Sequence, residues 1–520
     1  MRGKAAWIIA AALWAGGAGT ATAVQQPPGA AKNVELVANL PEGRYATAIN
    51  FLSYGHGRRA TEVMLITGRF GLKSYDISTP SAPRLLDEVT SEELHLPGDP
   101  PVKMDPPDQS TYWQNEDMDV DRSRKLAILS RDPRSYRGST SREPGEEDPN
   151  GATNIAGVYV VDAKDPRDLR LLSFTQLPTG HTSSCIDGCR YLWTGGPAST
   201  VHQREDLGWA LGRPIIVTDL RDPAHPVAHP DEPLDLFRAD GTTAYSHDVQ
   251  VDDAGIAWVS GLGGVRGYWT SGRHADPVSG ERREATPLDP IPYGGGGFAD
   301  DAVGDTPGGW MHNSARPVGP RAPKGDKRYK RGELLLATEE DFGPPEEACR
   351  DRGAFTIASL DGSYGGEGWR STPEQPFRLR TVGRWSPYAQ EGTRTEGLTF
   401  CSAHYFDVDG PLVTYAWYGQ GTRFLDVSRP EQPIQVAYWR PDDGNVWASY
   451  LHDGYVYTAD HGRGIDVLRL KTGAHAAAAR RREVVAPPMS LRQVAYLRGL
   501  SRQLRPDPST GYLCLLPVAR

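Results

Sequence analysis

Short runs of apolar residues recur along the chain, and each run is bounded by Gly, Pro or Asp. A unit consists of an apolar run, a Gly-rich turn, a second apolar run that ends in Asp or another polar residue, and a Pro-containing turn. The first copy occupies residues 64–68 and 71–78, and the second occupies residues 126–130 and 157–162. Runs of this length that are rich in Val, Ile, Leu and Tyr predict β-strands.

Five further copies bring the total to seven: residues 191–195 with 214–219, 256–261 with 264–269, 334–338 with 354–359, 412–416 with 422–428, and 455–459 with 464–468. Another strand often follows a copy, as at residues 169–174. Four short antiparallel strands in each of seven units predict an all-β fold, a seven-bladed β-propeller of four-stranded antiparallel blades.

The two ends of the repeat region complement each other. The seventh copy ends after its third strand, near Leu468, and residues 33–40 resemble the missing fourth strand. Pairing of these segments would leave no free sheet edge between the first and last blades. We therefore expect a propeller over residues 33–470 that is closed by the N-terminal strand.

The chain begins with a pattern typical of a secretory signal peptide. Arg2 and Lys4 precede an uncharged, mostly apolar stretch at residues 5–18 and a small-residue cleavage motif at residues 21–23. A membrane anchor is the alternative, but the stretch is shorter than the ~20 residues that span a bilayer. We predict a signal peptide over residues 1–23, a secreted or extracytoplasmic mature protein, and no transmembrane segment in that mature chain.

Two segments flank the predicted propeller. Residues 24–32 are expected to form a linker, and residues 471–520 a tail with a short helix. Ser490 is a suitable N-terminal cap for this helix. One helix face would then carry Leu491, Val494, Leu497 and Leu500.

Composition and charge narrow the function classes. The 58 Gly and 43 Pro make up about a fifth of the 520 residues, in keeping with many turns, and the formal net charge is −9. A net negative charge does not favour binding to the negatively charged phosphate backbone, so no nucleic-acid partner is expected. The sequence also lacks a phosphate-binding P-loop, a His-Glu-x-x-His motif and a Gly-x-Ser-x-Gly elbow.

The chain has five cysteines, so at least one is unpaired if it stays monomeric. Cys185 and Cys189 flank a tight turn, which predicts a small disulfide that clamps a hairpin. A metal-binding pair is the alternative, but no second close Cys or His pair accompanies them. Cys349 and Cys401 are candidates for a second disulfide, and Cys514 in the tail is the odd cysteine.

The repeat resembles the LVIVD repeat family of bacterial β-propellers. Residues 157–173 carry the resemblance best, followed by residues 422–434, and it extends over most of residues 33–470. The copies at residues 264–269 and 354–359 lack the Asp-x-x-x-Pro turn, which puts their outer strands in question. The resemblance implies a secreted propeller and specifies no activity.

One constellation of polar residues recurs at the start of the first strand of successive units. Glu116 opens this strand in the second unit, and imidazoles follow at intervals of about 65 residues until an insertion lengthens the last interval. The imidazoles belong to His181, His247, His312 and His404.

In a propeller the first strand of each blade lines the central channel, so these five side chains should form a ring around the axis. Imidazole and carboxylate ligands suit Cu, Zn, Fe or Mn. The alternative is a ring of polar groups that holds channel water. His452 and His461 fall at other points of the repeat and are placed outside the ring, and Asp117 and Asp248 should point away from it.

The His-Asp-Val strand start at residues 247–249 is similar to those of the selenium-binding protein and methanethiol oxidase family. That family also has seven blades and channel-facing histidines, and it binds copper; the similarity is one of architecture. The leading hypothesis is a secreted propeller whose axial pocket binds a transition metal, and which acts on a small molecule as an oxidoreductase or hydrolase if it is an enzyme. The competing hypothesis is a metal-free extracellular scaffold that binds a protein or glycan through long rim loops.

Overall fold

The computed structural model describes most of the chain between residues 27 and 503. The described ranges are 27–55, 57, 60–97, 99, 116–132, 155–196, 215–234, 246–261, 264–276, 279–298, 311–340, 353–361, 378–387 and 402–503. The predicted signal peptide, Cys349, Cys401 and Cys514 lie outside these ranges, as do large parts of the long loops.

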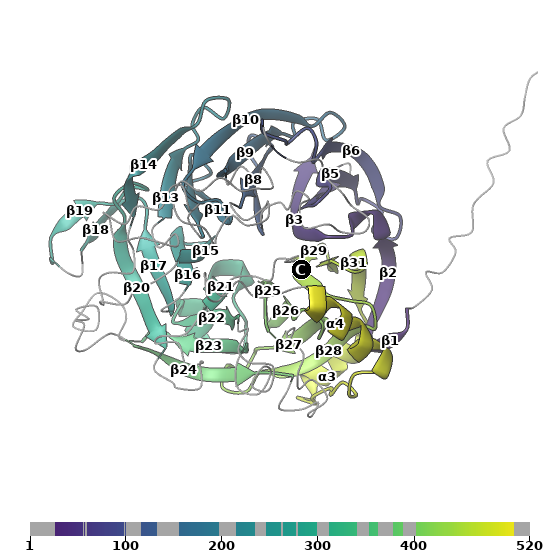
Figure 1. Ribbon diagram of the computed structural model, residues 1–520. Coiled ribbons are helices and arrows are strands. Elements are labelled where there is room, and N and C mark those ends of the chain that lie inside the picture. The colour runs from purple at the N-terminus through teal and green to yellow at the C-terminus, as the bar shows by residue number, and fades with distance from the viewer. Residues whose placement is uncertain are drawn as a thin grey trace, which may run out of the picture.

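The fold is all-β, with antiparallel sheets arranged around a central axis in a propeller-like manner (Figure 1). In order from the axis outward, the first sheet contains β3 (Ala46–Tyr54), β4 (Thr61–Gly68), β5 (Gly71–Asp76) and β6 (Arg84–Thr90). The second contains β7 (Met118–Asp121), β8 (Leu126–Arg131), β9 (Ala156–Asp162) and β10 (Arg170–Leu177). The third contains β11 (Thr182–Ile186), β12 (Tyr191–Gly195), β13 (Ile215–Asp219) and β14 (Val227–Leu234).

The next two groups of four strands join into one eight-stranded sheet. They are β15 (Ser246–Val251), β16 (Ile256–Gly261), β17 (Gly264–Trp269) and β20 (Ile291–Phe298), and then β21 (Met311–Ala315), β22 (Leu334–Glu339), β23 (Phe355–Ser359) and β24 (Arg378–Trp385). The outer strands β20 and β24 pair in parallel over only two residue pairs. This pairing differs from separate four-stranded units, and it occurs where Gly297 has no side chain to hold the two backbones apart.

The last two sheets include the N-terminal strands. One contains β25 (Phe406–Asp409), β26 (Leu412–Ala416), β27 (Thr422–Asp426) and β28 (Ile434–Pro441), with β1 (Gly29–Lys32) on its outer edge. The other contains β29 (Val446–His452), β30 (Tyr455–Asp460), β31 (Gly464–Leu470) and β2 (Val34–Leu40). The expected pairing of the segment at 33–40 with the last strand is present, from Val34 opposite Leu470 to Leu40 opposite Ile465.

Part of the expected linker is a strand. Residues 29–32 form β1, which pairs antiparallel with β28. The outer edge of β28 offers unpaired backbone groups, and β1 satisfies them. The copies at residues 264–269 and 354–359 lack the Asp-x-x-x-Pro turn, but each still has an outer strand. These strands are β20 and β24.

The core lies between neighbouring sheets. Ile66 and Tyr75 of the first sheet pack in one cluster with Tyr457 and Ile465 of the last. Because the sheets stack face to face around the ring, the middle strands are covered on both sides and their apolar runs are continuous. In β4 the fully buried run is Val63, Met64, Leu65 and Ile66.

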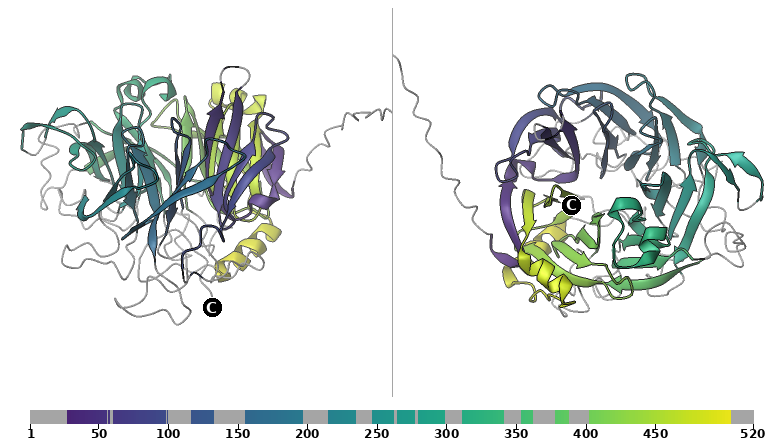
Figure 2. Two further views of the ribbon diagram at one scale, coloured as in Figure 1. Left: turned by 90° about the horizontal axis from the view of Figure 1, so that it is seen from above. Right: turned by 180° about the vertical axis from the view of Figure 1, so that it is seen from behind.

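The described residues also form several smaller elements. They are the hairpin β18 (Arg273–Ala275) and β19 (Arg282–Glu284), the 3-10 turns η1 (Pro41–Gly43) and η7 (Gly319–Arg321), and the helices α1 (Lys327–Arg331), α3 (Thr472–Ala479) and α4 (Leu491–Gln503). The described part of the tail, residues 471–503, therefore has two helices where one was expected, and α4 lies at one rim of the ring (Figure 2). Among the described residues, no helix combines the length and apolar character needed to cross a bilayer.

The start of α4 matches its predicted cap, but the predicted apolar face is only partly correct. Ser490 Oγ accepts a hydrogen bond from the Gln493 amide at 3.0 Å. Leu497 is fully buried, whereas Leu491 is 83% exposed. At 3.6 residues per turn, Leu491 lies about 120° around the helix from Leu497, so the two side chains do not share one face.

Candidate metal centre

The structure brings Glu116, His181, His247, His312 and His404 together on the axis, and all five are at most 2% exposed. Local irregularities in the inner strands turn two of them inward. In β15 the pairing passes from Ser246 to Asp248 and skips His247, and in β21 it skips His312 in the same way. A β-bulge of this kind re-aims a side chain.

The same irregularity falls at Thr47 in β3 and at Trp447 in β29. These two residues therefore occupy the matching positions in the sheets that supply no imidazole or carboxylate.

A glycine makes room for His181. Gly196 has a φ of 108°, and a Cβ atom on it would lie 2.0 Å from the His181 Cβ.

The four Nε2 atoms converge on the Glu116 carboxylate. His312 Nε2 and His404 Nε2 lie 2.6 and 2.7 Å from Glu116 Oε1. On the other side, His181 Nε2 contacts Glu116 Oε2, and His247 Nε2 lies 3.7 Å from that same oxygen. The result is a compact, buried set of nitrogen and oxygen atoms with electron pairs to donate.

The opposite nitrogen of three imidazoles is held by an acceptor. His181 Nδ1 lies 2.6 Å from Asp132 Oδ2. His247 Nδ1 lies 3.0 Å from the His312 carbonyl oxygen, and His404 Nδ1 lies 2.5 Å from the Trp447 carbonyl oxygen. Since these oxygens accept hydrogen bonds, each Nδ1 carries the proton, and in the neutral imidazole the Nε2 atom is left with a lone pair.

With the imidazoles neutral, Nε2 lone pairs would face one another inside the ring. His181 Nε2 and His247 Nε2 are 3.0 Å apart. His404 Nε2 is buried and has no hydrogen-bond partner among the described residues, although a carboxylate oxygen lies close by. Such an arrangement is repulsive unless a positive charge, either a proton or a metal ion, lies between the donors.

The electrostatics show where a proton is held. Burial alone would lower the pKa of His181, but Glu116 and Asp132 outweigh it and raise the pKa to about 9. Burial, reinforced by His404 and His247, holds the pKa of the His312 imidazole well below its usual range. A proton at His181 thus competes with any metal ion for the same nitrogen.

Two acidic residues at the centre were missed in the sequence. Asp132 directly follows β8 and orients His181, while Glu340 directly follows β22 and is fully buried. Glu340 Oε2 lies 4.0 Å from His312 Nε2, Glu340 Oε1 lies 3.8 Å from His404 Nε2, and the Tyr418 hydroxyl donates to Glu340. Both acidic residues directly follow the second strand of their sheet. A comparison of that position between repeats, like the one made for the starts of the inner strands, could have revealed them.

The residues placed outside the ring do lie outside it. His461 stacks on the Trp447 ring with 4.3 Å between centroids, and His452 lies 3.4 Å from Glu62 Oε2. Asp248 Oδ2 accepts a hydrogen bond from Asn313 at 2.7 Å.

A cavity of about 940 Å³ is lined by residues of several inner strands and by the turn at Asp187. His452 also lines it. It is also lined by Asp117, Asn313 and Tyr405, which directly follow Glu116, His312 and His404 in sequence. The five residues of the ring are not among the residues that line this cavity.

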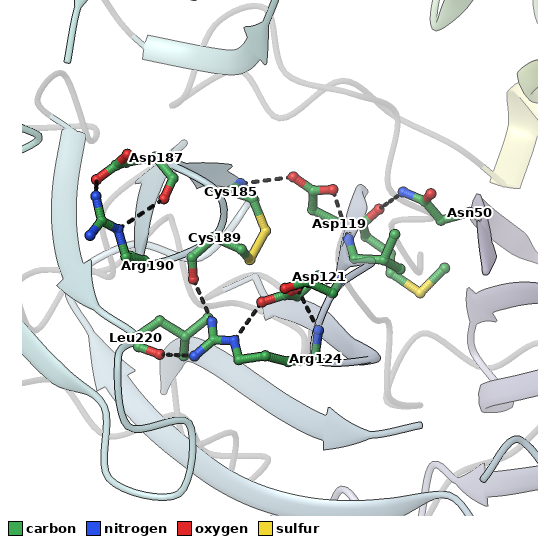
Figure 3. Close-up of a disulfide and its surroundings, with 12 residues drawn as sticks. Asn50, Asp119, Asp121, Arg124, Cys185, Asp187, Cys189, Arg190 and Leu220 are labelled. Carbon is green, nitrogen blue, oxygen red and sulfur yellow. Dashed lines mark hydrogen bonds and ion pairs between the residues drawn. A yellow bond between two sulfur atoms is a disulfide. The ribbon is translucent and has the colours of Figure 1, made fainter. Parts of the chain in front are cut away.

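The predicted disulfide between Cys185 and Cys189 is present and lines this cavity (Figure 3). It occupies the turn between β11 and β12, so these sulfurs are not available as thiolate ligands. Asp119 accepts a hydrogen bond from the Cys185 amide at 2.7 Å, and Arg124 donates to the Cys189 carbonyl oxygen at 2.6 Å. These contacts attach the disulfide turn to the neighbouring sheet.

Comparison with known protein families gives no match, and no curated protein matches the sequence. Among solved structures, the chain is similar to Chaetomium thermophilum Sqt1 bound to the N-terminus of the ribosomal protein L10, with a TM-score of 0.41, 12% identity, and coverage of 82% of this chain and 97% of that chain. It is also similar to a putative 6-phosphogluconolactonase from Bacteroides fragilis, with a TM-score of 0.38, 10% identity, and coverage of 84% and 97%. Similarity at this level supports no conclusion about function, and the LVIVD resemblance stays a prediction.

Proposed function

We propose that the chain is a secreted seven-bladed β-propeller that binds a transition metal through His181, His247, His312, His404 and Glu116. The observation that carries the metal proposal is the convergence of four Nε2 atoms on one buried carboxylate, with Nδ1 of three imidazoles held as a donor. Hydrogen bonds at Nδ1 are the usual means by which proteins direct Nε2 toward a metal.

The proposed architecture has one blade for each repeat and is closed where β2 completes the sheet of β29, β30 and β31. The pairing of β2 with β31 supports it. The disulfide of Cys185 and Cys189 supports export from the cytoplasm, because such bonds persist in oxidising compartments.

Nitrogen and oxygen donors of this kind suit Cu, Zn, Fe or Mn. A metal in this position supplies Lewis-acid or redox chemistry, and the cavity that reaches Asn313 and Tyr405 admits a small molecule. We therefore propose a metal-dependent oxidoreductase or hydrolase with a small-molecule substrate. The walls that would orient that substrate include Asp117, Asn313 and Tyr405.

Elemental analysis of the mature protein purified from its native host tests the metal proposal. We expect stoichiometric Cu, Zn, Fe or Mn, and loss of that metal in the double variant His247→Ala, His312→Ala. His225→Ala, in which an exposed side chain is removed, is the matched control and should retain the metal. A metal-free protein whose melting temperature responds to neither chelator nor added metal would contradict the proposal and support the scaffold that binds a protein or glycan through its rim loops.

A further inference from the structure

The two oxygens of Glu116 serve different halves of the ring. Oε1 faces His312 and His404, with both Nε2 atoms within 2.7 Å of it. Oε2 faces His181 and His247. A carboxylate that bound a single ion together with all four imidazoles would not need to divide them in this way.

Among the described residues, two of the possible ligand sets share only Glu116. In each set, Glu116 with His181 and His247 or Glu116 with His312 and His404, one atom per residue lies within 4.8 Å of the others. That spacing suits donors around one ion at bond lengths of ~2.0–2.2 Å. Glu340 forms a further set with His247 and His312, and it adds an oxygen donor on the side of His312.

The buried acidic residues at the centre also favour bound cations. Three carboxylates, Glu116, Asp132 and Glu340, are each at most 2% exposed. Buried carboxylates persist when a cation compensates them, and Glu340 adds an oxygen donor close to His312 and His404.

We propose that the centre binds two metal ions bridged by the Glu116 carboxylate. His181 and His247 hold one ion, and His312 and His404 hold the other with Glu340 as an additional ligand. This inference rests on the proposed function and extends it, because two ions side by side can bind both oxygens of one substrate group or clamp the attacking and leaving oxygens of a displacement.

Metal counting on the full mature chain tests the inference. Metal-free protein is titrated separately with Cu²⁺, Zn²⁺ and Mn²⁺ and desalted, and the metal content is measured per chain. We expect two ions per chain for at least one metal. We expect one ion per chain in the double variant His181→Ala, His247→Ala, and also in the double variant His312→Ala, His404→Ala.

Electron paramagnetic resonance of the Cu²⁺-loaded protein gives a second readout. A bridged pair should show spin coupling, and each half-ring variant should show the signal of an isolated ion. Glu116→Gln keeps the shape of the side chain and should remove the coupling. If a variant does not fold, the wild-type stoichiometry and spectrum still decide the question.

The outcomes separate the two proposals. One ion per wild-type chain for every metal tested, with an isolated-ion spectrum, overturns the two-ion inference and leaves the metal-binding function standing. No bound ion overturns both. His452→Ala is the control for the separate group of Glu62, His452 and Asp453, and loss of one ion in that variant would also overturn the inference.

Discussion

Metal affinity should rise steeply with pH, because His181 carries a proton that the metal must displace. Glu116 and Asp132 overcome the opposing effect of burial and raise the pKa of His181 to about 9. At pH 7 only about 1% of the chains then have an unprotonated His181. The apparent dissociation constant at pH 7 should therefore be about 100-fold larger than above pH 9. Between about pH 6 and pH 8 the affinity should improve about tenfold per pH unit.

Competition with a chromophoric chelator, corrected for the chelator's own protonation, measures this affinity at each pH. Calorimetry in two buffers of different ionisation enthalpy counts the protons released. We expect about one proton from His181 at pH 7 and none from His312, because burial holds the pKa of His312 well below its usual range and keeps it neutral. Affinity that stays constant from pH 6 to pH 9 would show that no proton at His181 competes with the metal.

Asp132→Asn is the matched variant for this experiment. It keeps the size of the side chain and removes the charge that lies 2.6 Å from His181 Nδ1. The pKa of His181 should fall, and the steep part of the pH profile should move to lower pH. At pH 9, where the proton no longer competes, the loss of the orienting carboxylate should weaken metal binding by about 10- to 100-fold.

Three further predictions concern stability. In the metal-free protein, the free energy of unfolding should fall by up to about 3 kcal/mol as pH rises from about 6.5 to about 9, since the pKa of His181 is raised in the folded state; urea denaturation measures this, and a rise over that range would contradict it. Leu497→Ala should cost about 2–5 kcal/mol in the same assay, whereas Leu491→Ala on the exposed side should change little; equal effects would show that α4 is not docked as described. Removal of residues 1–40 deletes β1 and β2 and leaves the β31 edge unpaired, so the shortened chain should aggregate during refolding, seen by light scattering; a folded monomer of unchanged stability would contradict this.

Local pattern in the sequence was enough to predict much of the fold. Strand length, bounding Gly and Pro residues and the repeat itself placed the strands, because each depends on neighbours within a few residues. The repeat also aligned His181, His247, His312 and His404 at one register. The disulfide of Cys185 and Cys189 could be predicted because the two residues flank a single turn.

Other features depended on how the sheets meet. Residues 29–32 form the strand β1 because the edge of β28 is free to pair with them. No residue near positions 29–32 in the sequence indicates that this edge exists. The contact of β20 with β24 depends on the angle between two sheets and on the absence of a side chain at Gly297.

The repeat specifies equivalent positions, so which residues can meet on the axis follows from local pattern along the chain. How they meet depends on the folded sheets. Glu116 and His312 are 196 positions apart in sequence, and their contact at 2.6 Å depends on the curvature of the ring and on bulges that turn the side chains inward. The same geometry brings Asp132 and Glu340 to the imidazoles from the ends of second strands and divides the four imidazoles between the two oxygens of one carboxylate.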